Sequence, residues 1–129
     1  MPVRFAAIAL AALLAGCAHC ATGQQAAVSD ILYFGTSKPG GTVSPQEWSE
    51  FLRDVVTPAF PDGFSAWPAY GQWKSGKGDI QREGSYVVSI VHREGDAAEA
   101  GIRALVAEYK SRFHQESVLR VSSPSCISF

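Results

Sequence analysis

Arg82 and Glu83 are the first side chains in the sequence that could take part in chemistry. They are neighbours in a long segment with the pattern of a strand, so they point to opposite faces of the sheet. A carboxylate on an open sheet face could act as a general base or could accept a hydrogen bond from a ligand. An ion pair between Glu83 and Arg112 or Arg120 is the simpler interpretation, and we favour it.

Aromatic side chains form a second group with binding chemistry. Trp67, Tyr70 and Trp73 lie close together in the sequence, and Gln72 adds an amide beside them. Such rings can bind the face of a sugar or a peptide. Aromatic residues on a strand more often belong to a core or a dimer interface, which we take as the first interpretation.

Polar residues gather again where a predicted helix passes into the last strand: Arg112, Gln115, Glu116 and Arg120. They could hold an anion, although charges that stabilise their own loop are the plainer explanation. The candidate ligand-binding residues are therefore Trp73, Arg82, Glu83, Arg112 and Arg120.

No catalytic motif accompanies these groups. His92 and His114 have no recognisable serine or cysteine partner, and their spacing does not suit a metal. The sequence contains no zinc-ligand spacing, phosphate-binding glycine loop or dinucleotide motif. We therefore predict no catalytic residue, no metal and no cofactor.

The elements that position these residues follow from hydrophobic periodicity and from capping signals. Strands are predicted at 31–34, 64–74, 80–92 and 118–121, where 64–74 is an irregular or edge strand and 126–129 extends the last strand or pairs separately. Loops are expected at 36–42 and 75–79. One helix begins after the N-cap Ser44 and stops at Pro58 and Pro61, and another begins at a capping box at 96–99 and continues to Phe113. Two i,i+4 ion pairs, Glu99 with Arg103 and Glu108 with Arg112, are expected on the solvent-exposed face of the second helix.

This order of elements, β-α-β-β-α-β, predicts an α+β, ferredoxin-like sandwich with two helices on one face of a four-stranded antiparallel sheet. No helix remains for the opposite face. That face must be a dimer interface, a ligand surface or a polar surface in contact with water.

The N-terminal residues predict export. A basic start precedes an apolar run at 5–15, which is too short to span a bilayer but suits a signal peptide. The sequence LAGC at 14–17 resembles the lipobox of bacterial lipoproteins, which implies a signal peptide at 1–16 and acylation of Cys17, for example with palmitate. Ordinary cleavage after Ala18 or Ala21 is the alternative. Ala18 after the cysteine favours the outer membrane over the inner one, with the protein facing the periplasm.

Residues 17–28 then form a lipidated cysteine with a flexible tether, and 29–129 form a single domain. Once Cys17 carries lipid, Cys20 and Cys126 remain as an even pair in an oxidising compartment, where they could form a disulfide. The alternative is that Cys126 is a small buried apolar residue.

Composition excludes several classes of protein. The chain has 129 residues, 47% of them hydrophobic, and a formal net charge of −1. A length of this order suits one folded domain, and the apolar share argues against extended disorder. The near-neutral charge without basic runs argues against a nucleic-acid partner.

Several separate motifs, taken in order, resemble one family. They are LYFG at 32–35, VSPQEW at 43–48, VTPAFPDG at 56–63, GQW at 71–73, RE at 82–83 and YKSRFHQESVLR at 109–120. Together they are similar to the small bacterial family called domain of unknown function 3574, over roughly 31–129. The resemblance implies no activity and transfers no catalytic residue.

Two functional hypotheses follow. The first is a membrane-anchored envelope lipoprotein, a non-enzymatic binding or structural module that forms a homodimer through the uncovered sheet face and binds an envelope protein or polymer. The second is a small cofactor-free enzyme of the oxygenase or isomerase type, with Glu83 and Arg82 or Arg120 in a pocket on that face.

Overall fold

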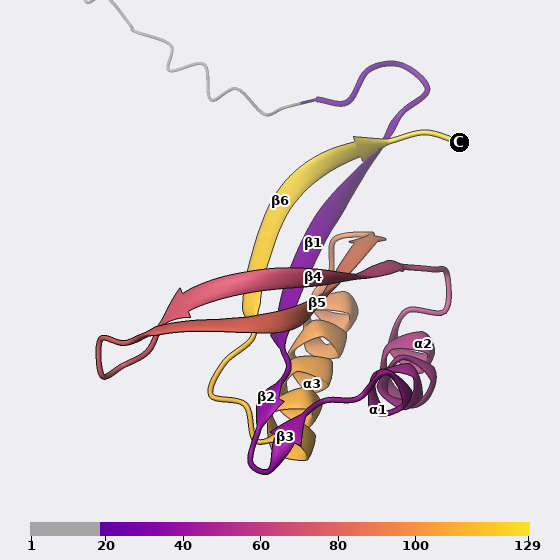
Figure 1. Ribbon diagram of the computed structural model, residues 1–129. Coiled ribbons are helices and arrows are strands. Elements are labelled where there is room, and N and C mark those ends of the chain that lie inside the picture. The colour runs from indigo at the N-terminus through magenta and orange to yellow at the C-terminus, as the bar shows by residue number, and fades with distance from the viewer. Residues whose placement is uncertain (1–18) are drawn as a thin grey trace, which may run out of the picture.

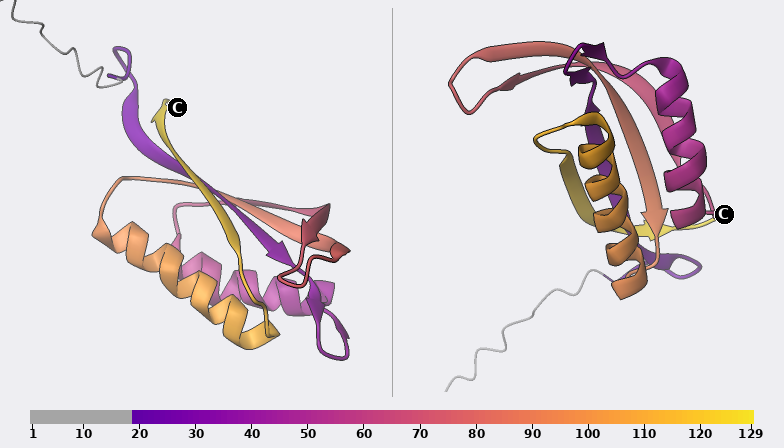
Figure 2. Two further views of the ribbon diagram at one scale, coloured as in Figure 1. Left: turned by 90° about the vertical axis from the view of Figure 1, so that its left-hand side faces the viewer. Right: turned by 90° about the horizontal axis from the view of Figure 1, so that it is seen from below.

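The computed structural model describes residues 19–129, and the predicted signal peptide and Cys17 lie outside the described residues. Four strands form the main antiparallel sheet, in the order β4-β5-β1-β6. They are β1 (Gln25–Gly35), β4 (Ser65–Lys74), β5 (Ile80–His92) and β6 (Leu119–Ile127). The helices α1 (Pro45–Phe51) and α3 (Asp96–Phe113) cover one face of this sheet (Figures 1 and 2). The α+β, ferredoxin-like sandwich predicted from the sequence is therefore confirmed.

The core lies between the sheet and the two helices. Leu32 and Phe34 of β1 and Val88 and Ile90 of β5 point to the helices, because they occupy the same alternate positions of paired strands. Tyr109 on α3 and Phe51 at the end of α1 are fully buried against them, and their rings lie 5.0 Å apart edge to face.

The first helix begins as its capping signals predict. Ser44 accepts a hydrogen bond from the Glu47 backbone, and Glu47 accepts one from the Ser44 backbone, a complete capping box. The helix continues through the π-helical turn η1 (Leu52–Val56) into α2 (Thr57–Ala59), so it includes Pro58 and ends at Ala59, between the two prolines predicted to stop it. The wider π turn changes the hydrogen-bond pattern just before Pro58, a residue that has no N–H to donate.

The capping box predicted at 96–99 does not form. Gly95 occupies the N-cap position of α3 and no side chain caps the helix. Glu99 does not bond back to the cap, because its carboxylate accepts a hydrogen bond from Arg120 at 2.8 Å. Both i,i+4 pairs expected on this helix are present, Glu99 with Arg103 and Glu108 with Arg112.

Strand β1 is longer than the sequence indicates. It begins at Gln25, so residues 25–28 of the predicted tether pair with β6, from Ile127 opposite Gln25 to Pro124 opposite Val28. Backbone pairing with the long β6 orders this segment although its side chains show no apolar periodicity. A disulfide joins Cys20 to Cys126 beside this pairing.

The loop predicted at 36–42 contains a small hairpin, β2 (Ser37–Lys38) paired with β3 (Gly41–Thr42). Its turn is formed by Pro39 and Gly40, and Gly40 has a positive φ of 82°. The hairpin lies near the C-terminal end of α3 (Figure 1). No helix within residues 19–129 combines the length and the apolar character that crossing a bilayer requires.

Candidate functional site

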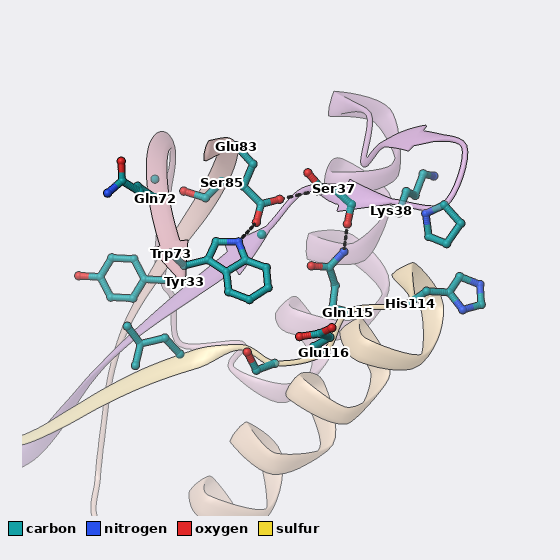
Figure 3. A pocket seen from close by; sticks show the side chains of 15 residues that line it. Tyr33, Ser37, Lys38, Gln72, Trp73, Glu83, Ser85, His114, Gln115 and Glu116 are labelled. Carbon is teal, nitrogen blue, oxygen red and sulfur yellow. Dashed lines mark hydrogen bonds between the residues drawn. The ribbon is translucent and has the colours of Figure 1, made fainter. Parts of the chain in front are cut away.

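A pocket of about 480 Å³ opens where the uncovered sheet face meets the β2–β3 hairpin and the loop between α3 and β6. Its walls come from β1, β4, β5, the start of β6 and these two connections. The lining residues used below are Tyr33, Gly35, Trp73, Glu83, Gln115 and Glu116. Figure 3 shows the side chains of this site, which we call the Trp73 pocket.

Glu83 is held at the pocket wall by three N–H donors. Its Oε2 accepts hydrogen bonds from the backbone N–H groups of Thr36 at 3.1 Å and of Ser37 at 2.6 Å. Its Oε1 accepts a hydrogen bond from Nε1 of Trp73 at 2.7 Å. One carboxylate therefore connects β5, β4 and the start of the β2–β3 hairpin.

Gly35 makes this approach of the carboxylate possible. A Cβ at this position would lie 2.9 Å from Glu83 Oε1 and 3.1 Å from Gln115 Oε1, closer than real Cβ atoms normally come to such atoms. The requirement for glycine is one of space, since Gly35 does not have a positive φ. The end of β1 must lack a side chain for the pocket to have its present wall.

The remaining wall is fixed from the α3–β6 loop and from the core. Gln115 Nε2 donates to the Ser37 carbonyl at 2.5 Å, which ties the loop to the hairpin. The buried Tyr109 hydroxyl donates to the Gly35 carbonyl at 2.7 Å. Burial, assisted by the negative charge of Glu83, raises the pKa of Tyr109 well above its usual value, so this hydroxyl remains a donor.

The geometry limits what Glu83 can do chemically. An ionised carboxylate has about four lone-pair positions for hydrogen bonds, and three are occupied by donors of the protein itself. A general base must have a free position directed at the proton that it removes. The arrangement suits a carboxylate that orients an indole ring better than one that removes a proton.

The arginines predicted to join Glu83 lie elsewhere. Arg82 is exposed and occupies the alternate position of β5, so it points to the opposite face. Arg112 pairs with Glu108, and Arg120 pairs with Asp30 and Glu99. The favoured ion pair of Glu83 with Arg112 or Arg120 is therefore wrong, because backbone and indole N–H groups take its place.

The predicted polar cluster at 112–120 is divided in the same way. Gln115 and Glu116 line the Trp73 pocket, whereas Arg120 points to the helix-covered face of the sheet. The turn after α3 brings Gln115 and Glu116 to the pocket, whereas strand alternation along β6 directs Arg120 to the other face. His114 has left-handed backbone geometry at the end of α3, with φ of 53°, and it lies at the edge of the pocket.

Asp30 is the buried charged residue that the sequence reasoning missed. Its carboxylate is fully buried, accepts two hydrogen bonds from Arg120 at 2.7 and 2.9 Å, and lies 2.7 Å from Nε2 of His92. Arg120 continues the network to Glu99 on α3. The signal was present: once the strand starts at Gln25, Asp30 shares the core-facing positions with Leu32 and Phe34.

This buried network determines the protonation of Asp30. Burial by itself would raise the pKa of this carboxyl, but hydrogen bonds from Arg120, His92 and Ser122 and the charge of Arg120 outweigh it and hold the pKa below its usual value. A second pocket of about 300 Å³ lies beside the network, lined by residues that include His92, Glu99 and Arg120.

The uncovered sheet face carries exposed aromatic and aliphatic side chains among serines. Its exposed large side chains occupy the alternate positions of paired strands: Tyr33, Trp67, Trp73, Val91, Leu119 and Val121. Trp67 and Trp73 are 43% and 40% exposed, so they are not core residues. Within residues 19–129, no group of three or more histidine, cysteine or acidic side chains is placed to hold a metal ion.

The fold and this site define a small ferredoxin-like domain with an aromatic pocket at the edge of an open sheet. The chain belongs to the family described as protein of unknown function DUF3574, whose model matches residues 29–129. No curated protein matches the sequence.

Two solved structures with the same fold are those of a phage enzyme. The structure of a phage SAM lyase in complex with S-methyl-5′-thioadenosine is similar to this chain with a TM-score of 0.61 and 17% identity, over 86% of this chain and 94% of the other. The apo state of a phage SAM lyase gives a TM-score of 0.57 and 19% identity, over 83% and 91%. At this identity the likeness shows a shared fold.

Proposed function

We propose that this chain is a binding module of the bacterial cell envelope, whose domain binds a small molecule in the Trp73 pocket without catalysing a reaction. The observation that carries the proposal is the triple hydrogen bonding of Glu83 by the protein's own N–H groups. These bonds occupy three of the about four lone-pair positions of Glu83, so little acceptor capacity remains for a general base, while they hold the Trp73 ring in a fixed orientation.

The pocket has the properties of a site for a flat, partly apolar molecule. Its volume of about 480 Å³ falls in the range of small-molecule sites. Tyr33 and Trp73 are 39% and 40% exposed, so both rings have surface available for contact. The hydrogen bond from Trp73 to Glu83 orders the indole ring before a ligand arrives, which lowers the entropy that binding costs.

Two observations support a location in the envelope. The lipobox-like sequence ends at Cys17, and a Cys20–Cys126 disulfide is typical of an oxidising compartment such as the periplasm. With Cys20 tied to β6, only residues 18 and 19 separate a lipidated Cys17 from Cys20, a reach of at most about 10 Å. The domain would then act at the membrane surface, at the outer membrane in preference to the inner one.

Two measurements test the proposal. Intact mass and detergent partitioning of the exported protein should show acyl chains that Cys17→Ala removes. Ligand-detected NMR with a set of aromatic fragments, on the full chain carrying Cys17→Ser, should give hits that Trp73→Ala abolishes and that Trp67→Ala, on the same sheet face, leaves unchanged. Fragments that still bind after Trp73→Ala would show that the Trp73 pocket is not their binding site.

A second copy of the chain is the partner that we propose for the uncovered sheet face. Its paired positions hold serines together with aromatic and aliphatic residues, so two copies can meet across its centre without burying an unpaired charge. Sedimentation should show concentration-dependent association that Val121→Lys abolishes. Ile80→Lys is the control, because Ile80 has nearly the same exposure, 49% against 47%, on the opposite face. Association unchanged by Val121→Lys would point instead to an envelope protein or polymer on this face.

An enzymatic role is the second candidate, a small cofactor-free enzyme whose pocket lies on the uncovered face. It is favoured by the shared fold with a phage SAM lyase whose structure holds S-methyl-5′-thioadenosine. Incubation with S-adenosylmethionine, with chromatographic analysis of the products, tests this. Under the binding proposal the compound remains intact, and turnover that Glu83→Gln abolishes would establish the enzyme.

A further inference from the structure

The charged side chains around the Trp73 pocket are arranged unevenly. Glu83 and Glu116 present carboxylates on the side of the Trp73 ring, whereas Lys38 and His114 lie on the far side of the loops (Figure 3). The pocket has aromatic walls, and its nearest charges are negative. This distribution of charge restricts the charge that a ligand of the Trp73 pocket can carry.

Lys38 does not offset these carboxylates. Its ammonium forms an ion pair with Glu47 at 2.5 Å and lies 5.7 Å from the centre of the Phe113 ring. Both partners lie outside the lining of the Trp73 pocket. The positive charge is therefore held against α1 and the end of α3, and Lys38 is the only lysine or arginine among the described residues that line the pocket.

Glu116 is the carboxylate that remains available. It is exposed in the α3–β6 loop, and no hydrogen bond or ion pair engages its side chain within residues 19–129. Glu83 differs, since protein donors occupy its oxygens, but its charge is still felt across the pocket. Two negative charges and two exposed aromatic rings therefore face one space.

We infer that the ligand of the Trp73 pocket is a small organic cation, a protonated amine or another onium group attached to a flat apolar body. The apolar body packs on the indole of Trp73 and the ring of Tyr33. The cationic group points toward Glu116 and gains further attraction from the aromatic faces. This inference rests on the proposed binding function and adds the charge of the ligand to it.

Three probes of similar shape and different charge test the inference at pH 7: 2-phenylethylamine as the cation, 3-phenylpropanamide as the neutral compound and 3-phenylpropionate as the anion. The full chain carrying Cys17→Ser is titrated with each, and the NMR signal of the Trp73 indole N–H is followed. We expect the amine to bind about tenfold tighter than the anion, with the amide between them.

Two variants distinguish the effect of the Glu116 charge in the pocket from the effect of the net charge of the protein. Glu116→Gln should weaken binding of the amine about two- to fivefold, the effect of one exposed ion pair, and should leave the amide unchanged. Glu94→Gln, an exposed carboxylate outside this pocket, should leave all three unchanged. Added salt should reduce the preference for the amine.

The outcomes distinguish this inference from the function on which it rests. If the anion binds as tightly as the amine, or if Glu116→Gln and Glu94→Gln have equal effects, the preference for a cation is wrong and the pocket remains a binding site. If none of the three probes shifts the Trp73 signal at millimolar concentration, both the inference and the proposed small-molecule role of the pocket are wrong.

Discussion

The indole Nε1 of Trp73 donates a hydrogen bond of 2.7 Å to Glu83 across the β4–β5 pair. The two residues are not directly opposite in the register, since Gly71 stands opposite Glu83 and Trp73 opposite Gln81. The contact is therefore a diagonal one, within reach of long side chains on one face of a sheet. Glu83 also binds the N–H groups of Thr36 and Ser37, so its loss would loosen two walls of the pocket at once.

Glu83→Gln should lower the free energy of unfolding by about 2 kcal/mol. A glutamine has one acceptor oxygen and an NH₂ group, so at least one of the three N–H donors would face another donor. Urea unfolding measures the change, and the Trp73 indole N–H signal reports the loss of its partner. Arg82→Gln, the exposed neighbour on the opposite face, should change stability by less than about 0.5 kcal/mol. Equal stability of the two variants would show that the carboxylate is not a structural anchor.

Gly35→Ala should cost about 1–2 kcal/mol, because the new Cβ would displace Glu83 and Gln115 from their positions 2.9 and 3.1 Å away. Binding in the Trp73 pocket should weaken in parallel. Thermal unfolding and the fragment titration check the two effects. Gly76→Ala is the matched control, since no atom lies within 4 Å of its added Cβ and its φ is not positive. If Gly35→Ala is as stable as Gly76→Ala, a Cβ at position 35 does not displace Glu83 and Gln115.

Asp30 should make stability depend on acid pH. Its pKa in the folded state lies below the unfolded value, so its contribution is complete above about pH 4 and is lost as the pH falls through the lowered pKa. Asp30→Asn should cost about 3 kcal/mol at pH 7, because Arg120 then loses its buried partner. The difference between the two proteins should shrink as the pH is lowered.

Urea unfolding at a series of pH values measures this convergence. Asp54→Asn serves as the control, because Asp54 is exposed and forms its ion pair with the neighbouring Arg53. If the difference in unfolding free energy between the wild type and Asp30→Asn stays constant from pH 7 to acid conditions, Asp30 is not the source of the pH dependence.

The Cys20–Cys126 disulfide should contribute about 4 kcal/mol, because it closes a loop with a sequence separation of 106. Unfolding with and without dithiothreitol measures this. The double variant Cys20→Ser/Cys126→Ser should match the reduced wild type and should not respond to the reductant. An unchanged unfolding midpoint after full reduction would show that the pairing of β1 with β6 holds the N-terminal segment without it.

The regular elements were predictable because their signals are local. The capping box of Ser44 and Glu47 and the apolar spacing along α3 need only neighbours in the chain, and both appear in the structure. The order of strands and helices then indicates the ferredoxin-like topology. Predictions failed where a distant partner competes for the same group. Glu99 leaves its own helix cap for Arg120, and the first four residues of β1 are ordered by pairing with β6.

The candidate site was predictable in part. Glu83 and Trp73 could be selected from residue type and strand position, and the structure brings them together. Strand alternation correctly predicts that Arg82 points away from Glu83, whereas Arg120 could not be placed without the register of β6, which puts it on the helix-covered face. Thr36 and Ser37 contribute through backbone N–H groups, which side-chain chemistry does not reveal.

The α+β class, the order of the elements, the family resemblance and the open sheet face follow from the amino-acid sequence alone, because periodicity and capping depend on residues close together in the chain. Which charges meet depends on the packing of distant elements. Asp30 lies between Arg120 and His92, and Glu83 lies beside Trp73 and the end of β1. The reason is physical: a buried carboxylate takes whatever donors the packed strands bring within hydrogen-bond distance, and that depends on register and twist rather than on the identity of its neighbours in the chain.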